Sequence, residues 1–332
     1  MPVKRKAEEY GVVPAKRGRQ EIAVAGTREK AVVTASVRLT FSTCLSADCV
    51  LCKLLYFHVI GQTSLIWEVY GSCDNVCVLK GHSGAITELS FNDDGSVLYT
   101  SSADNSAGVW DAVRGCRIRR LKGHSLVVNS VNAGHNHRLV TGSDDSMAKV
   151  WDDRSRNATA SLDCSYPVTS VVVKDNVLMT GGLDNVIKVW DLRKNDTLYR
   201  LSGHSDTVTG LALSPCGGKL ASLGADATLR TWDVRPWTPA ERAMLTIGAA
   251  RSGPDKLLLR CAWGGPSALM AAGGAERRVR VWAHDGTLLY DLGGHRAAVT
   301  AVDLHPREHI LLSAGVDKQI YLGELSPSAA HL

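Results

Sequence analysis

A short pattern returns along the chain at a nearly constant interval. Gly-His opens a segment, and Trp-Asp or a degenerate pair closes it 27 or 28 residues later. The closers stand at positions 67, 110, 151, 190, 232, 282 and 323, so they are 39 to 50 residues apart. Such a period indicates an array in which each unit buries its apolar surface against its neighbours. Seven closers predict seven repeats in one domain. The Gly-His pairs are Gly81-His82, Gly123-His124, Gly203-His204 and Gly294-His295; the closers are Trp67-Glu68, Trp110-Asp111, Trp151-Asp152, Trp190-Asp191, Trp232-Asp233, Trp282-Ala283 and Gly323-Glu324.

Each repeat is built from short apolar runs rather than helical stripes. Runs of four to six residues, such as ITELSF at 86–91, alternate with turn pairs such as Asp94-Gly95 and Asp285-Gly286. No window carries a long stripe at helical spacing. A four-stranded sheet cannot cover both of its own faces, so neighbouring sheets must stack. The sequence therefore predicts an all-β fold.

The period and its signature resemble the WD-repeat family. The resemblance covers nearly all of the chain after residue 30. It implies a seven-bladed β-propeller over residues 31–325, with an aberrant first blade. A disordered basic tail at 1–30 and a disordered end at 326–332 would flank it.

The recurring Ser, His and Asp also invite a catalytic-triad interpretation. Their recurrence argues against it, because an enzyme needs one well-built site whereas a structural device is needed in every blade. The resemblance implies hydrogen-bonded tetrads in which His donates to a turn Asp while Ser and Trp complete the chain. Full or partial tetrads are expected at His82, Ser102, Asp104 and Trp110; at His124, Ser143, Asp145 and Trp151; at Asp184 and Trp190; and at His204, Asp226 and Trp232.

Some repeats depart from this tetrad pattern. Gly182, Gly224 and Gly315 replace the expected Ser, and Glu276 replaces the turn Asp, so those tetrads should be incomplete. The fourth and sixth repeats also lack Gly-His and should depend more on apolar packing. Asp104→Ala or Asp145→Ala should lower stability by roughly 1–3 kcal/mol, because donors would lose their partner.

The first repeat does not match the others. Residues 31–62 lack the Gly-His and the turn Asp, and the pattern returns only at Thr63. A divergent blade, an insertion or a misjoined gene model would each explain this segment, and the abrupt return favours the last. Propellers of this family close by pairing an N-terminal strand with the last repeat, so the altered region around Val32 to Thr40 could weaken closure and expose strand edges.

Charge is concentrated at the N-terminus. Of the net charge of +5, residues 1–30 carry +4, from eight basic and four acidic residues, which leaves +1 for the rest. The repeats are thus poorly suited to bind phosphates, and a protein partner is expected. The tail resembles a bipartite nuclear-import signal, which an import receptor would bind; a solvated tail that touches RNA is the alternative. The basic clusters are Lys4, Arg5 and Lys6, then Lys16, Arg17 and Arg19.

No segment predicts a cofactor, a metal or a membrane span. Nine cysteines without a clustered framework or signal peptide favour free thiols in a reducing compartment. Cys49 and Cys52, with Cys44 and His58 nearby, have zinc-like spacing but no second pair. The apolar run at 49–60 is too short to span a bilayer, and a soluble protein without a small-molecule substrate is expected.

Several segments resemble, in order from Trp67 to Leu325, the WD-repeat proteins of the U5 small nuclear ribonucleoprotein. DVRPWTPAER at 233–242 and the closer Gly323-Glu324 are the least generic of them. This resemblance implies a non-catalytic nuclear scaffold in pre-mRNA splicing, in contact with the large core protein of that particle and only indirectly with U5 snRNA. Trp237, in the longest interval, is a candidate partner contact or else covers a blade edge.

Another class of adaptor remains open. WDDR, WDLR and WDVR end at Arg154, Arg193 and Arg235 and resemble the WDxR element of substrate receptors for cullin-RING ubiquitin ligases. These arginines would then be partner contacts, although an Arg after Trp-Asp is also common at strand ends. A chromatin or signalling adaptor is the third possibility.

Overall fold

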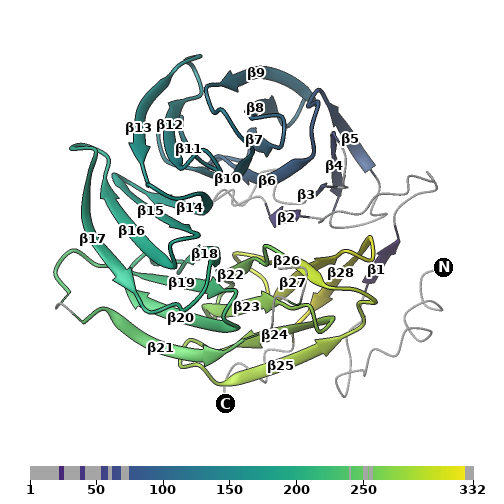
Figure 1. The fold of residues 1–332 in the computed structure, drawn as a ribbon. Coiled ribbons are helices and arrows are strands. Elements are labelled where there is room, and N and C mark those ends of the chain that lie inside the picture. The colour runs from purple at the N-terminus through teal and green to yellow at the C-terminus, as the bar shows by residue number, and fades with distance from the viewer. Residues whose placement is uncertain are drawn as a thin grey trace. The chain divides into compact units, whose positions relative to one another are not determined.

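The structure, a computed structural model, describes residues 22–25, 38–41, 54–58, 62–68, 75–238, 241–249, 253 and 257–325. All regular structure within them is β-strand, in 28 strands that form seven four-stranded sheets (Figure 1). The all-β prediction is confirmed. The chain divides into a central unit, Thr40–Leu211, and a terminal unit that joins Met1–Leu39 to Ala212–Leu332.

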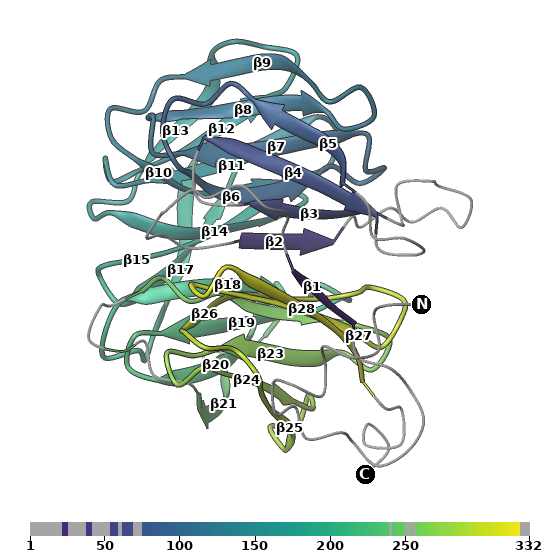
Figure 2. The same cartoon turned by 90° about the vertical axis from the view of Figure 1, so that its right-hand side faces the viewer.

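The sheets of the central unit follow the order of the chain. Figure 2 shows β9, β8, β7 and β6 in that order from the top. The first sheet, whose β2 begins just before the unit boundary, contains β2 (Arg38–Phe41), β3 (Leu54–His58), β4 (Thr63–Glu68) and β5 (Asn75–Lys80). The second contains β6 (Ile86–Phe91), β7 (Val97–Ser102), β8 (Ser106–Asp111) and β9 (Cys116–Lys122). The third contains β10 (Val128–Ala133), β11 (Arg138–Ser143), β12 (Met147–Asp152) and β13 (Ala158–Asp163); the fourth contains β14 (Val168–Lys174), β15 (Val177–Gly182), β16 (Val186–Asp191) and β17 (Asp196–Ser202).

The last three sheets complete the described chain. The fifth contains β18 (Val208–Leu213), which crosses the unit boundary, with β19 (Lys219–Gly224), β20 (Thr228–Asp233) and β21 (Ala243–Gly248). The sixth contains β22 (Cys261–Gly264), β23 (Leu269–Gly273), β24 (Arg278–Trp282) and β25 (Leu288–Gly293). The seventh contains β26 (Val299–Leu304), β27 (Ile310–Gly315), β28 (Gln319–Glu324) and β1 (Ile22–Ala25).

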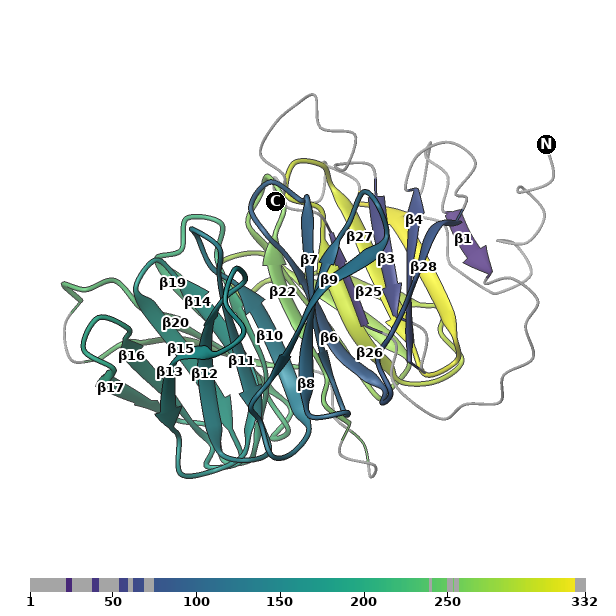
Figure 3. The same cartoon turned by 90° about the horizontal axis from the view of Figure 1, so that it is seen from above.

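The seventh sheet joins the two ends of the described chain. Ile22 pairs with Leu322 and Ala25 with Gln319, and Figure 3 shows β1 beside β28. The strand that pairs with the last repeat is therefore β1, and not the region from Val32 to Thr40 that the sequence suggested. The tail predicted at 1–30 likewise contains a strand at residues 22–25.

Part of the doubtful segment 31–62 also forms strands. β2 and β3 lie in it, and β3 pairs with β4 from Leu54 opposite Glu68 to His58 opposite Ser64. The backbone thus has a four-stranded first sheet. Whether the segment is a divergent blade, an insertion or a misjoined gene model stays a prediction.

The apolar core lies between consecutive sheets. Ile66 and Leu79 of the first sheet cluster with Leu89, Leu98 and Trp110 of the second. Similar clusters join the second sheet to the third, the third to the fourth, the fifth to the sixth and the sixth to the seventh. This is the stacking that the repeat pattern predicted, because a lone sheet would leave one apolar face in water.

Polar side chains also connect neighbouring sheets. Ser90 Oγ on β6 accepts the Ala133 N–H at 3.0 Å, and Ser130 Oγ on β10 accepts the Val171 N–H at 3.0 Å. Ser170 Oγ on β14 accepts the Leu211 N–H at 3.1 Å. These bonds satisfy backbone groups on the first strand of the next sheet and fix its register.

Candidate functional site

The second sheet holds a chain of four hydrogen-bonded side chains. His82 Nδ1 lies 2.9 Å from Asp104 Oδ2, and His82 Nε2 lies 2.7 Å from Thr100 Oγ1. Trp110 Nε1 donates to the same Thr100 oxygen at 2.9 Å. Since indole only donates and carboxylate only accepts, a consistent assignment has Nδ1–H donating to Asp104 and the Thr100 hydroxyl donating to Nε2. All three hydrogen bonds therefore run in one donor-to-acceptor direction, from the Trp110 indole to the Asp104 carboxylate.

The third sheet repeats this network. His124 Nδ1 lies 2.7 Å from Asp145 and its Nε2 lies 2.8 Å from Thr141 Oγ1, to which Trp151 donates at 2.8 Å. The His and Trp side chains are buried.

The seventh sheet keeps the network in altered form. His295 lies 3.0 Å from Asp317 Oδ2 and 3.0 Å from Ser313 Oγ. Tyr321 meets the His295 ring edge-on at 4.5 Å, and its hydroxyl donates to the Gly294 carbonyl. An aromatic ring from β28 thus packs on the histidine although the closer is Gly323-Glu324.

The hydroxyl partner is not the serine that the sequence suggested. Ser102 and Ser143 instead donate to the backbone carbonyls of Gly84 and Val127. The hydroxyl that the Trp indole reaches stands four residues before the turn acid, not two. Networks with Gly at the suggested position therefore still have their hydroxyl. Trp indoles donate to Thr100, Thr141, Thr180 and Ser222, and Ser313 holds the same position beside His295.

Strand register explains the difference. Trp110 pairs with Leu98 across the hairpin, and Thr100 pairs with Gly108. Ser102 is four residues from Leu98 and Thr100 only two, so Thr100 is the closer hydroxyl to Trp110. Counting register outward from the turn would have found it in the sequence.

The turn acid Asp104 also organises its own hairpin. Asp104 Oδ1 accepts the Ser106 N–H at 3.1 Å, and Oδ2 accepts the Ser83 N–H at 3.0 Å. Asn105, which stands between Asp104 and Ser106 in the chain, has a positive φ of 61°. One carboxylate therefore holds the turn and joins it to the preceding loop, a structural rather than a catalytic arrangement.

Removing one shared hydroxyl tests the corrected network. Thr141→Val keeps the shape but leaves Trp151 without an acceptor and His124 without its partner, so we expect a loss of about 2 kcal/mol in urea unfolding. Thr180→Val should cost less, because no histidine contacts Thr180 and its closest strong donor is Trp190, at 3.0 Å. Equal losses for the two variants, or none, would contradict the network.

Protonation of the histidines should weaken the fold. Burial lowers the pKa of His82 and His124 below 6.5, although the hydrogen bonds to Asp104 and Asp145 oppose this. Below about pH 6.5 the unfolded chain therefore binds protons that these folded histidines do not, and stability falls as pH falls. Burial raises the pKa of the two carboxyls, but hydrogen bonds outweigh it and hold the pKa below 3.8, so they stay charged in this window.

We therefore expect the unfolding free energy to decrease between pH 7.5 and 5.5, by at most about 1.4 kcal/mol per pH unit for each histidine. Urea unfolding across that range measures it. The slope should shrink in a His82→Gln/His124→Gln variant, because glutamine does not titrate there. A stability that is flat or rises on acidification would contradict the assignment of neutral histidines.

Two sheets without Gly-His use a cation instead. Lys188 Nζ lies 2.7 Å from Asp184 Oδ2, and the two side chains are 9% and 15% exposed. Lys188 also donates to the Cys164 carbonyl. In the sixth sheet Arg280 contacts Glu276 at 2.5 Å with the same spacing of four residues. Neither cation stands out in the spacing of the repeats.

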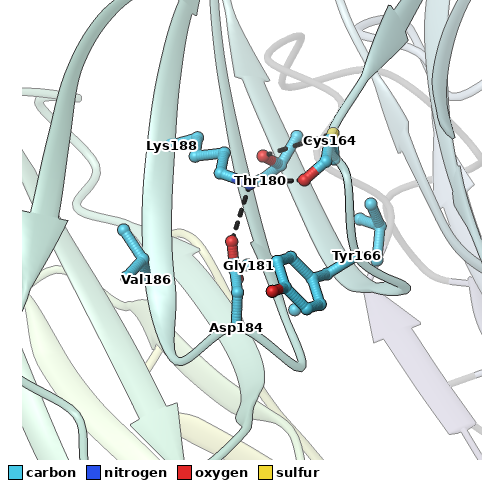
Figure 4. A pocket seen from close by; sticks show the side chains of 9 residues that line it. Cys164, Tyr166, Thr180, Gly181, Asp184, Val186 and Lys188 are labelled. Carbon is cyan, nitrogen blue, oxygen red and sulfur yellow. Dashed lines mark hydrogen bonds and ion pairs between the residues drawn. The ribbon is translucent and has the colours of Figure 1, made fainter. Parts of the chain in front are cut away.

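Lys188 and Asp184 border a small, open hollow. Figure 4 shows Lys188 at the upper left, Cys164 at the upper right and Tyr166 below Cys164. Burial raises the pKa of the Cys164 thiol to about 11. The thiol is therefore protonated at neutral pH and is a poor nucleophile or metal ligand.

Two hydrogen bonds of the fifth sheet follow the same pattern. Trp232 donates to Ser222 at 2.8 Å, and Asp226 accepts from the Thr228 N–H at 3.0 Å. His204 is buried.

The three WDxR arginines bind their own aspartates. Arg154 donates from Nε and Nη2 to Asp152 at 2.9 and 2.6 Å, and Arg193 repeats this with Asp191 at 3.0 and 2.9 Å. Arg235 makes the same paired contact with Asp233. Hydrogen bonds from Arg154 and Arg193 lower the pKa of Asp152 and Asp191 to about 2. One edge of each guanidinium is therefore already occupied.

Trp237 lies in the connection between β20 and β21 and is 94% exposed, so it does not cover a blade edge. Nearby, Arg242 donates to the Arg235 carbonyl at 2.9 Å and Thr238 donates to Asp233 at 2.9 Å. These two hydrogen bonds hold the loop that carries the Trp237 indole.

The remaining predicted sites give less information. Over the described ranges there is no group of three or more His, Cys, Asp or Glu residues that could hold a metal ion. Cys77, Cys116, Cys164, Cys216 and Cys261 are free thiols. Within the same ranges no helix has the length and apolarity to cross a membrane. The side chains of the basic tail clusters, Cys44, Cys49, Cys52 and His58 and the end at 326–332 lie outside what is described.

The family assignment comes from comparison with known sequences. The family model "WD domain, G-beta repeat" matches residues 73–111, 115–152, 157–191, 195–233 and 286–322, which is more than half of the chain. The chain belongs to the WD-repeat family. The predicted family resemblance is confirmed.

Within the WD-repeat family, this chain has relatives that align along almost its full length. It is 41% identical to the human U5 small nuclear ribonucleoprotein 40 kDa protein over 353 residues, covering 97% of this chain and 98% of the relative. It is 40% identical to the pre-mRNA-splicing factor cwf17 of Schizosaccharomyces pombe over 266 residues, 79% of this chain and 78% of the relative. The Dictyostelium discoideum U5 40 kDa protein is 42% identical over 79% of this chain and 76% of the relative.

Proposed function

We propose that this WD-repeat protein is a non-catalytic scaffold of the U5 small nuclear ribonucleoprotein that acts in pre-mRNA splicing as a seven-bladed propeller. The similarity to U5 40 kDa proteins along 97% of the chain carries the proposal. The side-chain networks support it, because His82, His124 and His295 are committed to partners within their own sheets.

The partners follow from the same proposal. The scaffold contacts spliceosomal proteins, in particular the large core protein of the particle, and associates with U5 snRNA only indirectly. Its tail engages an import receptor, and the protein accumulates in the nucleus. Purification from nuclear extract, with identification of bound proteins and RNA, tests the assignment. Recovery of U5 proteins supports it, whereas an adaptor with a cullin, or histones, supports a rival.

The import signal has a separate test. Replacing Lys4, Arg5, Lys16 and Arg17 with alanine should abolish nuclear accumulation, because both basic clusters lose the charges that acidic receptor grooves bind. Imaging of a fluorescent fusion measures this. Unchanged nuclear accumulation would remove the import proposal without affecting the scaffold.

Trp237 is the proposed partner contact. An indole that is 94% exposed on an anchored loop resembles the aromatic anchors that dominate interfaces. Trp237→Ala should reduce co-purification of U5 proteins at least about tenfold while leaving thermal stability unchanged. Leu288→Ala, at a site 51% exposed, is the control and should have no effect. Equal recovery with both variants would show that Trp237 is not a contact.

The ligase-receptor alternative can be tested at the arginines. Arg154 and Arg193 already bind Asp152 and Asp191 with two bonds each, so docking would have to use their remaining edges. An Arg154→Ala/Arg193→Ala variant should keep its U5 partners. Loss of a cullin adaptor from the purified complex would instead favour the receptor.

A further inference from the structure

Three exposed apolar side chains gather on loops of the third and fourth sheets. Leu126, Tyr166 and Leu183, here called the Tyr166 patch, are 51%, 54% and 50% exposed. Leu126 lies between β9 and β10, Tyr166 between β13 and β14, and Leu183 between β15 and β16. Their exposure costs solvation free energy that a partner could recover by covering them.

Backbone hydrogen bonds hold these loops together. Leu183 N–H donates to the Pro167 carbonyl at 3.1 Å, which places Leu183 beside the loop of Tyr166. The Cys164 N–H donates to the Ser146 backbone carbonyl at 2.8 Å, and the Asp144 N–H donates to the Val127 backbone carbonyl at 3.0 Å. The turn at 144–146 therefore bridges the loop of Leu126 to that of Tyr166. The patch is one anchored surface within the central unit.

The Tyr166 patch has a hollow on one side. Tyr166, Val186 and Lys188 are among the residues that line it, and Figure 4 shows the Tyr166 ring beside Asp184 and below Lys188. The hollow is small, so an occupant would enter with the end of one side chain. The ammonium of Lys188 is bound to Asp184 and the Cys164 carbonyl, so it offers little charge to a ligand.

The loop segments around the patch carry acidic residues, while Lys188 Nζ lies 5.9 Å from the centre of the Tyr166 ring. The connecting segments 123–127, 144–147, 163–167, 183–186 and 203–207 are all described and contain no Lys or Arg. They contain the aspartates Asp144, Asp145, Asp163, Asp184 and Asp206. Asp163 is exposed beside the Tyr166 loop. Such a rim repels phosphates, which disfavours RNA, and attracts Lys and Arg.

We propose that the Tyr166 patch docks a basic, extended segment of a partner protein. One apolar side chain of the segment enters the hollow and packs on Tyr166 and Leu183. Flanking Lys or Arg side chains of the segment lie against the exposed carboxylate of Asp163. This surface is independent of Trp237 and goes beyond the scaffold assignment, which survives if the patch fails.

A random 12-residue peptide library displayed on phage and selected against the purified full chain tests the proposal. The enriched peptides should carry net positive charge around at least one large apolar residue. Synthetic copies should bind more weakly in 0.3 M than in 0.05 M salt, because the rim interactions are screened. Enrichment of neutral or acidic peptides, or no enrichment, overturns the proposal.

Matched variants locate the binding site. Leu183→Ser should weaken the selected peptides at least about tenfold, and Asp163→Asn about threefold. Leu198→Ser is the control, because Leu198 is equally exposed on β17 of the same sheet but lies outside the patch. Its affinity should stay within about twofold of the unsubstituted chain. Equal effects of the two leucine changes would place the peptides elsewhere and overturn the assignment.

Discussion

Asp104→Ala is expected to lower the free energy of unfolding by about 3 kcal/mol, the upper end of the range for unpaired buried donors. The carboxylate accepts from His82, from the Ser83 and Ser106 amides and from the Ser106 hydroxyl. Arg120 lies 3.0 Å from it as well. Alanine leaves these donors without their acceptor and releases the turn from the preceding loop. Urea unfolding at pH 7.5 measures the loss.

Two substitutions calibrate that result. Asp104→Asn keeps an oxygen for the Ser106 amide and should cost less than alanine. Asp196→Ala removes an exposed carboxylate that accepts from the Thr197 amide, and should change stability by less than about 0.5 kcal/mol. If Asp104→Ala were as mild as Asp196→Ala, the turn acids would not be structural.

Lys188→Met is expected to cost about 3–5 kcal/mol, as breaking a buried ion pair does. Methionine fills similar space but leaves the Asp184 carboxylate with no cation and the Cys164 carbonyl with one donor fewer. Lys194→Met, at an exposed lysine, is the control and should be nearly neutral. Thermal and urea unfolding report both.

A double variant separates loss of the pair from loss of the lysine stem. Asp184→Asn together with Lys188→Met removes both charges and should recover at least half of the stability that Lys188→Met loses. Additive losses would mean that the pair does not act as a unit. The cation would then not replace the missing histidine of the fourth sheet.

The residues that recur from repeat to repeat could be predicted from the sequence, whereas the contacts that depend on strand register could not. His82, Asp104 and Trp110 come together as expected because each recurs at fixed spacing, and repeated spacing places residues at equivalent points of each sheet. Thr100 was missed because two hydroxyls share that strand face and only the hairpin register separates them.

Other features left no signal in the pattern. Lys188 did not stand out, because neither its burial nor its bond to the Cys164 carbonyl shows in the spacing of the repeat. The pairing of Ile22–Ala25 with β28 was hidden because a four-residue apolar run within a charged tail is too short to stand out. Ser90 and Ser130 were equally inconspicuous, because their bonds depend on the register between separate sheets.

The pairing of β1 with β28 sets the order in which this protein can mature. Between 294 and 300 residues separate the paired positions, so one strand leaves the ribosome first and the other nearly last. At about 5–20 residues per second, β1 waits roughly 15–60 s for its partner. Throughout synthesis its edge is open to chaperones or to a neighbouring nascent chain. A messenger RNA that ends before codon 319 would release a polypeptide that lacks the partner strand of β1, so the edge of β1 would stay unpaired.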